Sequence, residues 1–372
     1  MGDHKLLRVE LKGTPNEIGT QHGTLLRVQI LRQLTFYKTL FKIRSNLDWP
    51  QVLTIAEEFQ NTLLKVAPDS LEEISGIAKG MNEPDIGPLD IVALNCRSEI
   101  ALGQFSDGCT SLGMHINGTE FLAQNWDWNS EIKDNIVLMS IERIGKPKFW
   151  MVTEAGIIGK IGFNALSIGV CLNAIRAKPM VSSKPPIHIL LRLVLESTSM
   201  KDAMGQIMKL GCATSAHMLI ADSAGSQGVE VSPPGTFIIK EDSERIVVHT
   251  NHFLLNNLVE EPLWLMDSPS RLERIRVLVA ELLVRENSKG TQVVIQHVRN
   301  LFRDTANPPG SICRVLDVAG ADSIVSIFNI CMNLRKGRPE AEVVFHLGSR
   351  SEGEPKPANR DRGSGSTQVN KA

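Results

Sequence analysis

The sequence predicts an α+β fold in which two stacked β-sheets lie between layers of helices. Apolar residues recur with helical spacing through most of the first 108 residues. Beyond residue 109 the pattern alternates every second residue, as in strands of a sheet with one covered face. Helical spacing returns in two pairs of segments, 187–210 and 270–304, among further strand-like runs. Runs of strands that alternate with pairs of helices are typical of sheets stacked between helix layers.

The N-terminal segment begins with an expected strand at residues 6–11 and continues as helices. Thr14 and Glu17 have the spacing of a capping box, with Pro15 at the first helical position. A long amphipathic helix is therefore expected from there to about residue 43. The helices expected after it lie at residues 49–66, from a second capping box of Ser70 and Glu73 to Gly80, and at 88–102.

A hairpin opens the second part of the chain. Asn117-Gly118 is a strong signal for a two-residue turn, and it joins the expected strands 109–116 and 119–126. Because this turn sets the register, Asp127 is expected close to the strand that begins with Cys109. The other expected elements are strands at 135–143, 149–154, 167–172, 217–221, 227–231, 237–240, 246–249, 323–331 and 341–347, and helices at 187–198, 200–210, 270–286 and 291–304.

The composition excludes several classes of function. The formal net charge is −1, so no electrostatic footprint for nucleic acid or an anionic membrane surface is visible. No apolar run approaches the ~18 residues of a membrane span. The six cysteines lie far apart without a Cys-x-x-Cys pair, which argues against a disulfide scaffold and a structural zinc site. We expect a cytoplasmic protein that holds no metal and acts on a small molecule.

The stretch Asp107-Gly108-Cys109-Thr110-Ser111 carries the first chemical hypothesis. If the bond between Gly108 and Cys109 is cut, Cys109 becomes an N-terminal residue. Its thiol then has a free α-amino group beside it, which is a nucleophile with its own base. The alternative is structural, because Asp-Gly is a common turn and a cysteine is more often a small buried apolar residue.

Three polar residues each allow two interpretations. Asn251 either donates its side-chain amide to an oxyanion, where such a donor contributes ~3 kcal/mol, or caps a strand at a turn. Asp127 either holds the amino group of Cys109 or is an ordinary acid at a strand end. Arg314 either pairs with Asp127 or a substrate carboxylate through its guanidinium fork, or is an exposed arginine.

Short blocks spread over most of the chain decide between these interpretations. Together they resemble the acyl-coenzyme A:6-aminopenicillanate acyltransferase family, whose members are cysteine N-terminal nucleophile (Ntn) hydrolases. The similarity reaches about residue 348 and runs through Gly13-Thr-Pro-Asn-Glu-Ile-Gly19, His22-Gly23, Gly76-Ile-Ala-Lys-Gly80, Asp107-Gly-Cys-Thr110, Gln124-Asn-Trp-Asp127, Thr153-Glu-Ala-Gly-Ile-Ile-Gly-Lys160, Gly162-Phe-Asn164, Leu195-Glu-Ser-Thr-Ser199, His249-Thr-Asn-His252 and Ser311-Ile-Cys-Arg314.

The resemblance implies a four-layer αββα sandwich that cleaves itself between Gly108 and Cys109. The helical segment 1–108 and the catalytic segment 109–348 would then be separate chains that stay together as a heterodimer of 1–108 and 109–372. By the same resemblance Cys109 is the nucleophile. Its catalytic partners are Asp127, Asn251 and Arg314, and its supporting residues are Thr110, Ser232 and Ser311.

The implied activity is transfer of an acyl group through a Cys109 thioester to an amine, in fungal-type secondary metabolism. The acyl donor would be a coenzyme A thioester, with no cofactor bound to the enzyme. Two alternatives stay open. One is an amidohydrolase that uses water as the acceptor and cleaves N-acyl or β-alanyl amides or small peptides. The other is an unprocessed relative that binds a ligand without turnover.

The last residues, 349–372, are rich in Ser, Gly, Pro, Lys and Arg and are expected to be a disordered tail. They end in Asn370-Lys371-Ala372, which is not a peroxisomal address of the Ser-Lys-Leu type. Penicillin-forming members of the family carry such an address. This departure makes a peroxisomal location and the penicillin pathway less favoured for this chain.

Overall fold

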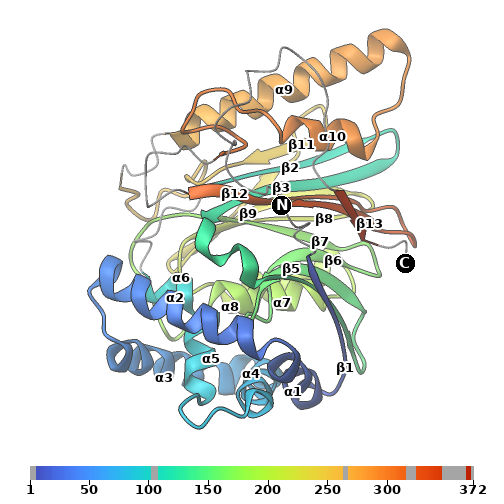
Figure 1. The fold of residues 1–372 in the computed structure, drawn as a ribbon. Helices are drawn as coiled ribbons and strands as arrows, with labels where there is room; N and C mark the ends of the chain where they lie inside the picture. Colours follow the sequence, from blue (N-terminus) through green and yellow to red (C-terminus); the bar gives the residue numbers. More distant parts are fainter. Residues whose placement is uncertain (1–5, 102–107, 263–266, 316–323, 346–365, 370–372) are drawn as a thin grey trace, which may run out of the picture.

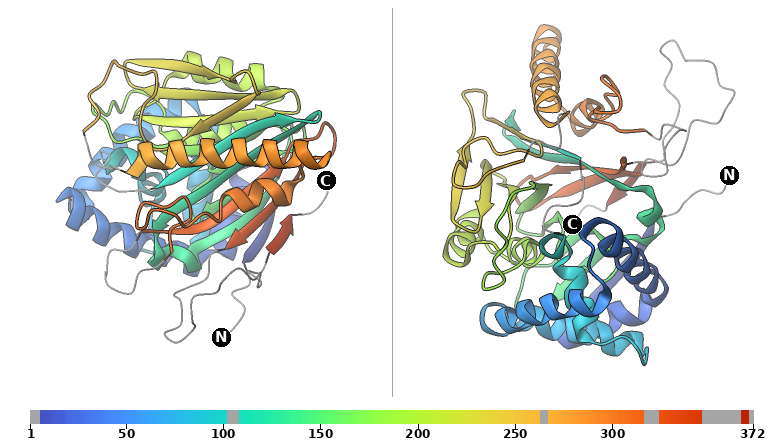
Figure 2. Two further views of the ribbon diagram at one scale, coloured as in Figure 1. Left: turned by 90° about the horizontal axis from the view of Figure 1, so that it is seen from above. Right: turned by 90° about the vertical axis from the view of Figure 1, so that its left-hand side faces the viewer.

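Two β-sheets stack face to face in the computed structural model, with helices on their outer sides (Figure 1). The structure describes residues 6–101, 108–262, 267–315, 324–345 and 366–369. One sheet has eight strands in the order β1-β4-β5-β6-β7-β8-β9-β10, and the other has six in the order β11-β2-β3-β12-β13-β14. Helices α9 and α10 cover the six-stranded sheet, and α1 to α8 lie beyond the eight-stranded one (Figures 1 and 2). The predicted mixed fold with two sheets is confirmed.

The elements of the N-terminal segment are one strand and a helical layer. Its strand β1 pairs in parallel with β4, so this segment also contributes to the eight-stranded sheet. Their bounds are β1 Leu7–Gly13, α1 Pro15–Leu25, α2 Arg27–Ser45, α3 Trp49–Val66, α4 Pro68–Met81, α5 Pro88–Asn95 and α6 Arg97–Ile100.

The capping box of Thr14 and Glu17 is confirmed, but the single long helix predicted after it is wrong. The chain breaks at Leu26, where ψ is 18°, and α1 and α2 run separately. Helix α1 packs closely on α4 through glycines, since a Cβ at Gly19 would lie 2.0 Å from the carbonyl oxygen of Glu73. This close packing sets the direction of α1.

Two other helix predictions need correction. Helix α4 begins at Pro68 rather than after Ser70, and Glu73 pairs with buried Arg192 at 2.6 Å instead of capping the helix. The helix predicted at 88–102 is two helices, which meet at Cys96, where ψ is 15°. In both regions the predicted type of element is correct and its bounds differ.

The remaining strands and helices mostly follow the prediction. The β2–β3 hairpin has Asn117 and Gly118 at φ 52° and 71°, as the predicted turn requires. Strand β6 was not predicted, because four residues with a glycine show no clear period. The bounds are β2 Cys109–Ile116, β3 Thr119–Asn129, η1 Ser130–Asn135, β4 Ile136–Arg143, β5 Phe149–Glu154, β6 Ile161–Asn164, β7 Gly169–Ala174, α7 Ile187–Leu195, α8 Met200–Leu210, β8 Ala216–Asp222, β9 Gly225–Ser232, β10 Gly235–Lys240, β11 Ile246–His249, α9 Asp267–Lys289, α10 Ile295–Leu301, β12 Ile324–Asn333, β13 Glu340–Phe345 and β14 Ser366–Val369.

Strand β14 lies within the range predicted as a disordered tail. It pairs antiparallel with β13, with Ala341 opposite Val369. The rest of that range, 349–365 and 370–372, is outside the described residues. The apolar core lies between the two sheets and under the helical layer, and a second cluster lies under α9 and α10.

Candidate active site

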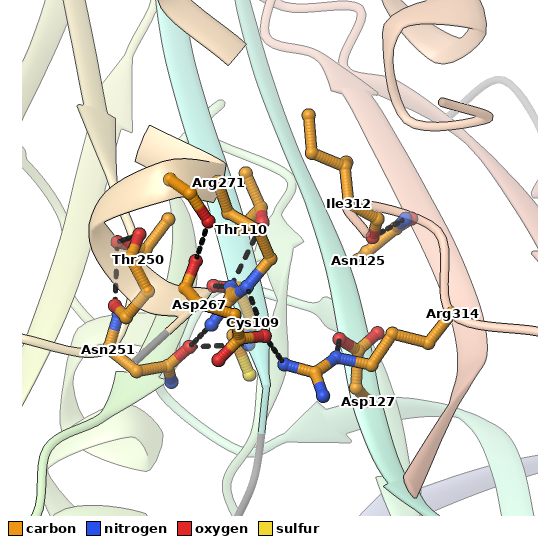
Figure 3. Close-up of polar contacts among 12 residues, drawn as sticks. Cys109, Thr110, Asn125, Asp127, Thr250, Asn251, Asp267, Arg271, Ile312 and Arg314 are labelled. Atoms are coloured by element: carbon orange, nitrogen blue, oxygen red, sulfur yellow. Dashed lines mark hydrogen bonds and ion pairs between the residues drawn. The ribbon is translucent and has the colours of Figure 1, made fainter. Parts of the chain in front are cut away.

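Cys109 is the first residue of β2, an inner strand of the six-stranded sheet, and it is buried. In the hairpin register it lies opposite Trp126 of β3. The next residue of β3, Asp127, donates its backbone amide to the carbonyl oxygen of Gly108 at 2.8 Å. The amide of Cys109 donates to Oδ1 of Asn251 at 2.7 Å (Figure 3). The peptide bond between Gly108 and Cys109 is therefore held by a hydrogen bond on each side.

Asn251 lies in the loop after β11, and β11 pairs with β2 so that His249 is opposite Ser111. Its Nδ2 donates to the carbonyl oxygen of Ala174 at 3.0 Å. In this uncleaved chain the side chain of Asn251 is thus an acceptor toward Cys109. The donor at the Gly108 carbonyl is the backbone amide of Asp127. The oxyanion role expected for Asn251 stays a prediction.

Asp127 and Arg314 form the predicted pair, with Nε of Arg314 3.0 Å from Oδ2 of Asp127. The other carboxylate oxygen accepts a hydrogen bond from Ser326 Oγ at 2.6 Å. Burial raises the pKa of Asp127 to about 6, against the opposite effect of the nearby Arg314 and Arg271 charges. The structure therefore places the Asp127 carboxylate against Arg314 and Ser326, while the amide of Cys109 has Asn251 as its partner.

Arg271 is a residue of the site that sequence reasoning missed. Its Nη1 donates to the carbonyl oxygen of Cys109 at 2.6 Å and to Thr110 Oγ1 at 3.2 Å, and its Nη2 donates to Asn251 Oδ1 at 2.9 Å (Figure 3). Asp267 pairs with both Arg271 and Arg314 and so joins the two guanidinium groups. Burial, and the Arg314 charge after it, lower the pKa of Arg271.

A signal for Arg271 was present in the sequence. The buried face of α9 carries apolar side chains at helical spacing, among them Leu272, Ile275, Val279 and Leu282. Arg271 stands on this buried face one turn before Ile275. A charged residue is almost never fully buried unless it is paired, so an arginine in an apolar stripe indicates a buried partner.

The predicted supporting residues lie in three places. Thr110 is buried and accepts the Arg271 bond already described. Ser232 accepts a hydrogen bond from Asn256 Nδ2 at 2.8 Å, which ties β9 to the loop that carries Asn251. Ser311 donates to the carbonyl oxygen of Thr305 at 3.0 Å and steadies the turn before Arg314.

The loop that carries Asn251 is held by a second missed residue, Glu230 of β9. This buried carboxylate accepts from Nε2 of His249 at 3.0 Å and from the amides of Leu255 at 3.0 Å and Asn256 at 2.8 Å. His249 in turn stacks on His217 with ring centroids 3.6 Å apart. The ends of the loop are therefore anchored on both sides of Asn251.

No group of three or more acidic, histidine or cysteine side chains among the described residues has an arrangement that would hold a metal ion. Likewise, within the described part of the chain, no helix is both long and apolar enough to cross a membrane. The site is instead a buried set of hydrogen bonds and ion pairs around one cysteine. Such a set can orient a thiol, an amine and a carbonyl for acyl transfer.

The model of the acyl-coenzyme A:6-aminopenicillanic acid acyltransferase family matches residues 114–338. The chain is also 33% identical over 346 residues to the acyl-coenzyme A:6-aminopenicillanic-acid-acyltransferase 40 kDa form of Emericella nidulans. This alignment covers 90% of this chain and 93% of that protein. Among solved structures, penicillin V acylase from Agrobacterium tumefaciens aligns with 64% of this chain and 83% of its own, at 11% identity and a TM-score of 0.43.

The family match and the 33% identical relative show that the chain is an enzyme that acts on amide or thioester bonds. It belongs to the acyl-coenzyme A:6-aminopenicillanic acid acyltransferase family. The resemblance drawn from the sequence blocks is thereby confirmed.

Proposed function

We propose that this enzyme cleaves its own chain between Gly108 and Cys109 and then uses Cys109 as an N-terminal nucleophile of the Ntn class. The observation that carries the proposal is the pair of hydrogen bonds on the two sides of that peptide bond. The thiol of Cys109 adds to the Gly108 carbonyl, and the Asp127 amide stabilises the oxyanion that forms. The C–N bond breaks, the nitrogen takes the thiol proton, and water hydrolyses the resulting thioester.

After cleavage the former amide nitrogen of Cys109 is an α-amino group that still faces Asn251 Oδ1. The amine accepts the thiol proton, and the sulfur attacks the thioester carbonyl of an acyl-coenzyme A. Coenzyme A leaves as its thiol, and the acyl group stays on Cys109. An amine acceptor then attacks this thioester, forms an amide and releases the Cys109 thiol.

The family and the similarity to the Emericella nidulans acyltransferase support coenzyme A thioesters as donors, an amine as acceptor and a role in fungal-type secondary metabolism. Water in place of the amine would make the same intermediate that of an amidohydrolase. A product assay with an acyl-coenzyme A, with and without an added amine, separates the two activities. Free acid as the sole product in both samples would favour the hydrolase.

Two buried ion pairs support a lasting heterodimer of residues 1–108 and 109–372. Arg97 of the first segment lies 2.9 Å from Glu154 of the second, and Glu73 lies 2.6 Å from Arg192. Separation of the segments would leave these charges unpaired or expose them together with the apolar core. Removing one partner of a buried pair costs ~3–5 kcal/mol, so the cleaved chains are expected to stay together.

Mass spectrometry and a denaturing gel of the wild-type protein beside Cys109→Ala test the proposal. The wild type is expected to yield fragments 1–108 and 109–372, while Cys109→Ala stays whole. Cys212→Ala is a matched control, because Cys212 is another buried cysteine and takes no part in the contacts described around Cys109, so its loss should leave cleavage intact. If the wild type stays whole and does not react with thioesters, the proposal is wrong, and an unprocessed ligand-binding protein becomes the better description.

A further inference from the structure

A cavity of about 930 Å³ lies between the loop that follows β7 and the loop that follows β11. This volume is in the range of ligand pockets, ≈ 300–1,000 Å³. Its lining residues are Arg176, Ala177, Lys178 and Pro179 on one side and Leu258, Val259, Glu260, Glu261 and Pro262 on the other.

One wall of this cavity is linked by a hydrogen bond to Asn251, and the other to the loop that carries Asn251. The first wall begins two residues after Ala174, whose carbonyl oxygen accepts from Asn251 Nδ2 at 3.0 Å. Two residues of extended chain span at most ~7 Å. On the second wall Glu261 Oε2 accepts from the amide of Phe253, two residues after Asn251, at 2.9 Å. The cavity therefore lies beside the candidate active site.

The charges of the two walls are opposite. Arg176 and Lys178 line one wall, and Glu260 and Glu261 line the other. Five of the nine lining residues are apolar, but an acyl chain buried here would leave the four charged groups without water or partners. An amine arrives at neutral pH as an ammonium ion, which a carboxylate can bind by a charge-assisted hydrogen bond.

We propose that this cavity binds the acceptor of the acyl transfer, a small amine, and that Glu261 receives its ammonium group. The inference rests on the proposed function. The ammonium gives one proton to the Glu261 carboxylate, and the neutral nitrogen attacks the carbonyl carbon of the Cys109 thioester. The C–S bond breaks, the sulfur takes the second proton from the nitrogen, and the amide product leaves. Arg176 and Lys178 then favour an acceptor that also carries an acidic group.

The environment of Glu261 suits a group that exchanges a proton near neutral pH. Burial raises its pKa to about 7, while the Phe253 hydrogen bond acts in the opposite direction and the Glu230 charge adds to the rise. Efficient proton acceptors have pKa values near the working pH.

The test uses the processed enzyme with hexanoyl-coenzyme A and three acceptors of similar size: β-alanine, β-alaninamide and n-propylamine. Amide product and free acid are measured together at several amine concentrations.

Glu261→Gln is expected to lower the ratio of amide to free acid about tenfold for all three amines, because it removes one charge-assisted hydrogen bond to the ammonium group. Lys178→Met, at an exposed position, is expected to lower the ratio for β-alanine and not for n-propylamine. Glu244→Gln is the control, because Glu244 is exposed and lies outside the cavity.

Each outcome separates the inference from the function on which it rests. If the wild type neither cleaves itself nor consumes the thioester, the proposed function fails. If the wild type makes amide and Glu261→Gln and Lys178→Met make it in the same ratio, the acceptor binds elsewhere and the inference is wrong. A rise in the KM for hexanoyl-coenzyme A, with an unchanged product ratio, would assign the cavity to the acyl donor and also overturn it.

Discussion

Nη1 of Arg271 lies 2.6 Å from the carbonyl oxygen of Cys109, so a buried cation is bound to the backbone of the nucleophile itself. The same guanidinium donates to Asn251 Oδ1 and thereby fixes which end of that amide faces Cys109. Arg271 is one of four charged groups around the nucleophile. The others are Asp267 on the same helix, Arg314, and Asp127 on β3.

Substitution of Arg271 should change both the rate and the pH dependence of the enzyme. A nearby cation disfavours the ammonium form of the Cys109 amine, so its removal should move the acid limb of the pH–rate profile up by about one unit. Arg271→Met is expected to slow self-cleavage at least tenfold, since Asn251 loses its orienting donor. Arg271→Lys keeps the charge and should restore the position of the limb.

Rates of cleavage and turnover between pH 5 and 9 check this prediction. Arg276→Met is the control, because Arg276 is on the same helix and its ion pair with Glu273 is exposed. An acid limb at the same pH in wild type and Arg271→Met would show that Arg271 has no electrostatic role.

Gly108→Ala should slow self-cleavage without unfolding the protein. A Cβ at this position would lie 2.7 Å from Asp127 Oδ2 and 2.6 Å from Arg314 Nη2, so the ion pair must move. Gly205→Ala is the matched control, because no atom lies within 4 Å of a Cβ there and Ala favours the helix by ~1 kcal/mol. Time courses on freshly expressed protein give the rates, and equal rates for the two variants would contradict the prediction.

The pKa of Asp127 is raised to about 6, and we therefore expect activity to increase as the pH rises through this value. Above that pH the carboxylate holds Arg314, and below it the protonated group does not. Stability should change in the opposite sense, because a pKa above the unfolded value of 3.8 means that the folded state binds the proton more tightly. The contribution of this group is thus most favourable below about pH 4 and is lost as the pH rises through about 6.

Asp127→Asn should remove both effects. Profiles of kcat/KM and of the urea midpoint between pH 4 and 8, for wild type and variant, check this. A wild-type rate that is flat from pH 5 to 7 would show that ionisation of Asp127 does not limit the reaction.

Glu230→Gln should weaken the loop that presents Asn251. The new NH₂ group would face amide donors of Leu255 and Asn256 or the ring of His249, which leaves buried donors without an acceptor. Each such loss costs ~1–3 kcal/mol, so the urea midpoint should fall together with the cleavage rate. Glu241→Gln, at a half-buried position just after β10, is expected to change the midpoint less. A wild-type midpoint in Glu230→Gln would rule out the anchoring role.

Local patterns predicted the part of the site that depends on one hairpin. Asn117-Gly118 allows a single tight turn, and the turn fixes which residues face each other, so Cys109 opposite Trp126 and Asp127 beside it follow from sequence. The helix at 49–66 and the capping box of Thr14 and Glu17 were also predictable, because hydrophobic period and capping are local properties.

What the sequence by itself determined is therefore the type and order of the elements, the hairpin that carries Cys109, and the family. Only the tertiary structure decided that α1 breaks at Leu26, that Glu73 pairs with Arg192, and that Arg271 reaches Cys109. These contacts join residues more than a hundred positions apart, or depend on how closely two helices approach. No local period or capping rule predicts these contacts, because they form only when elements that are distant in the sequence pack together.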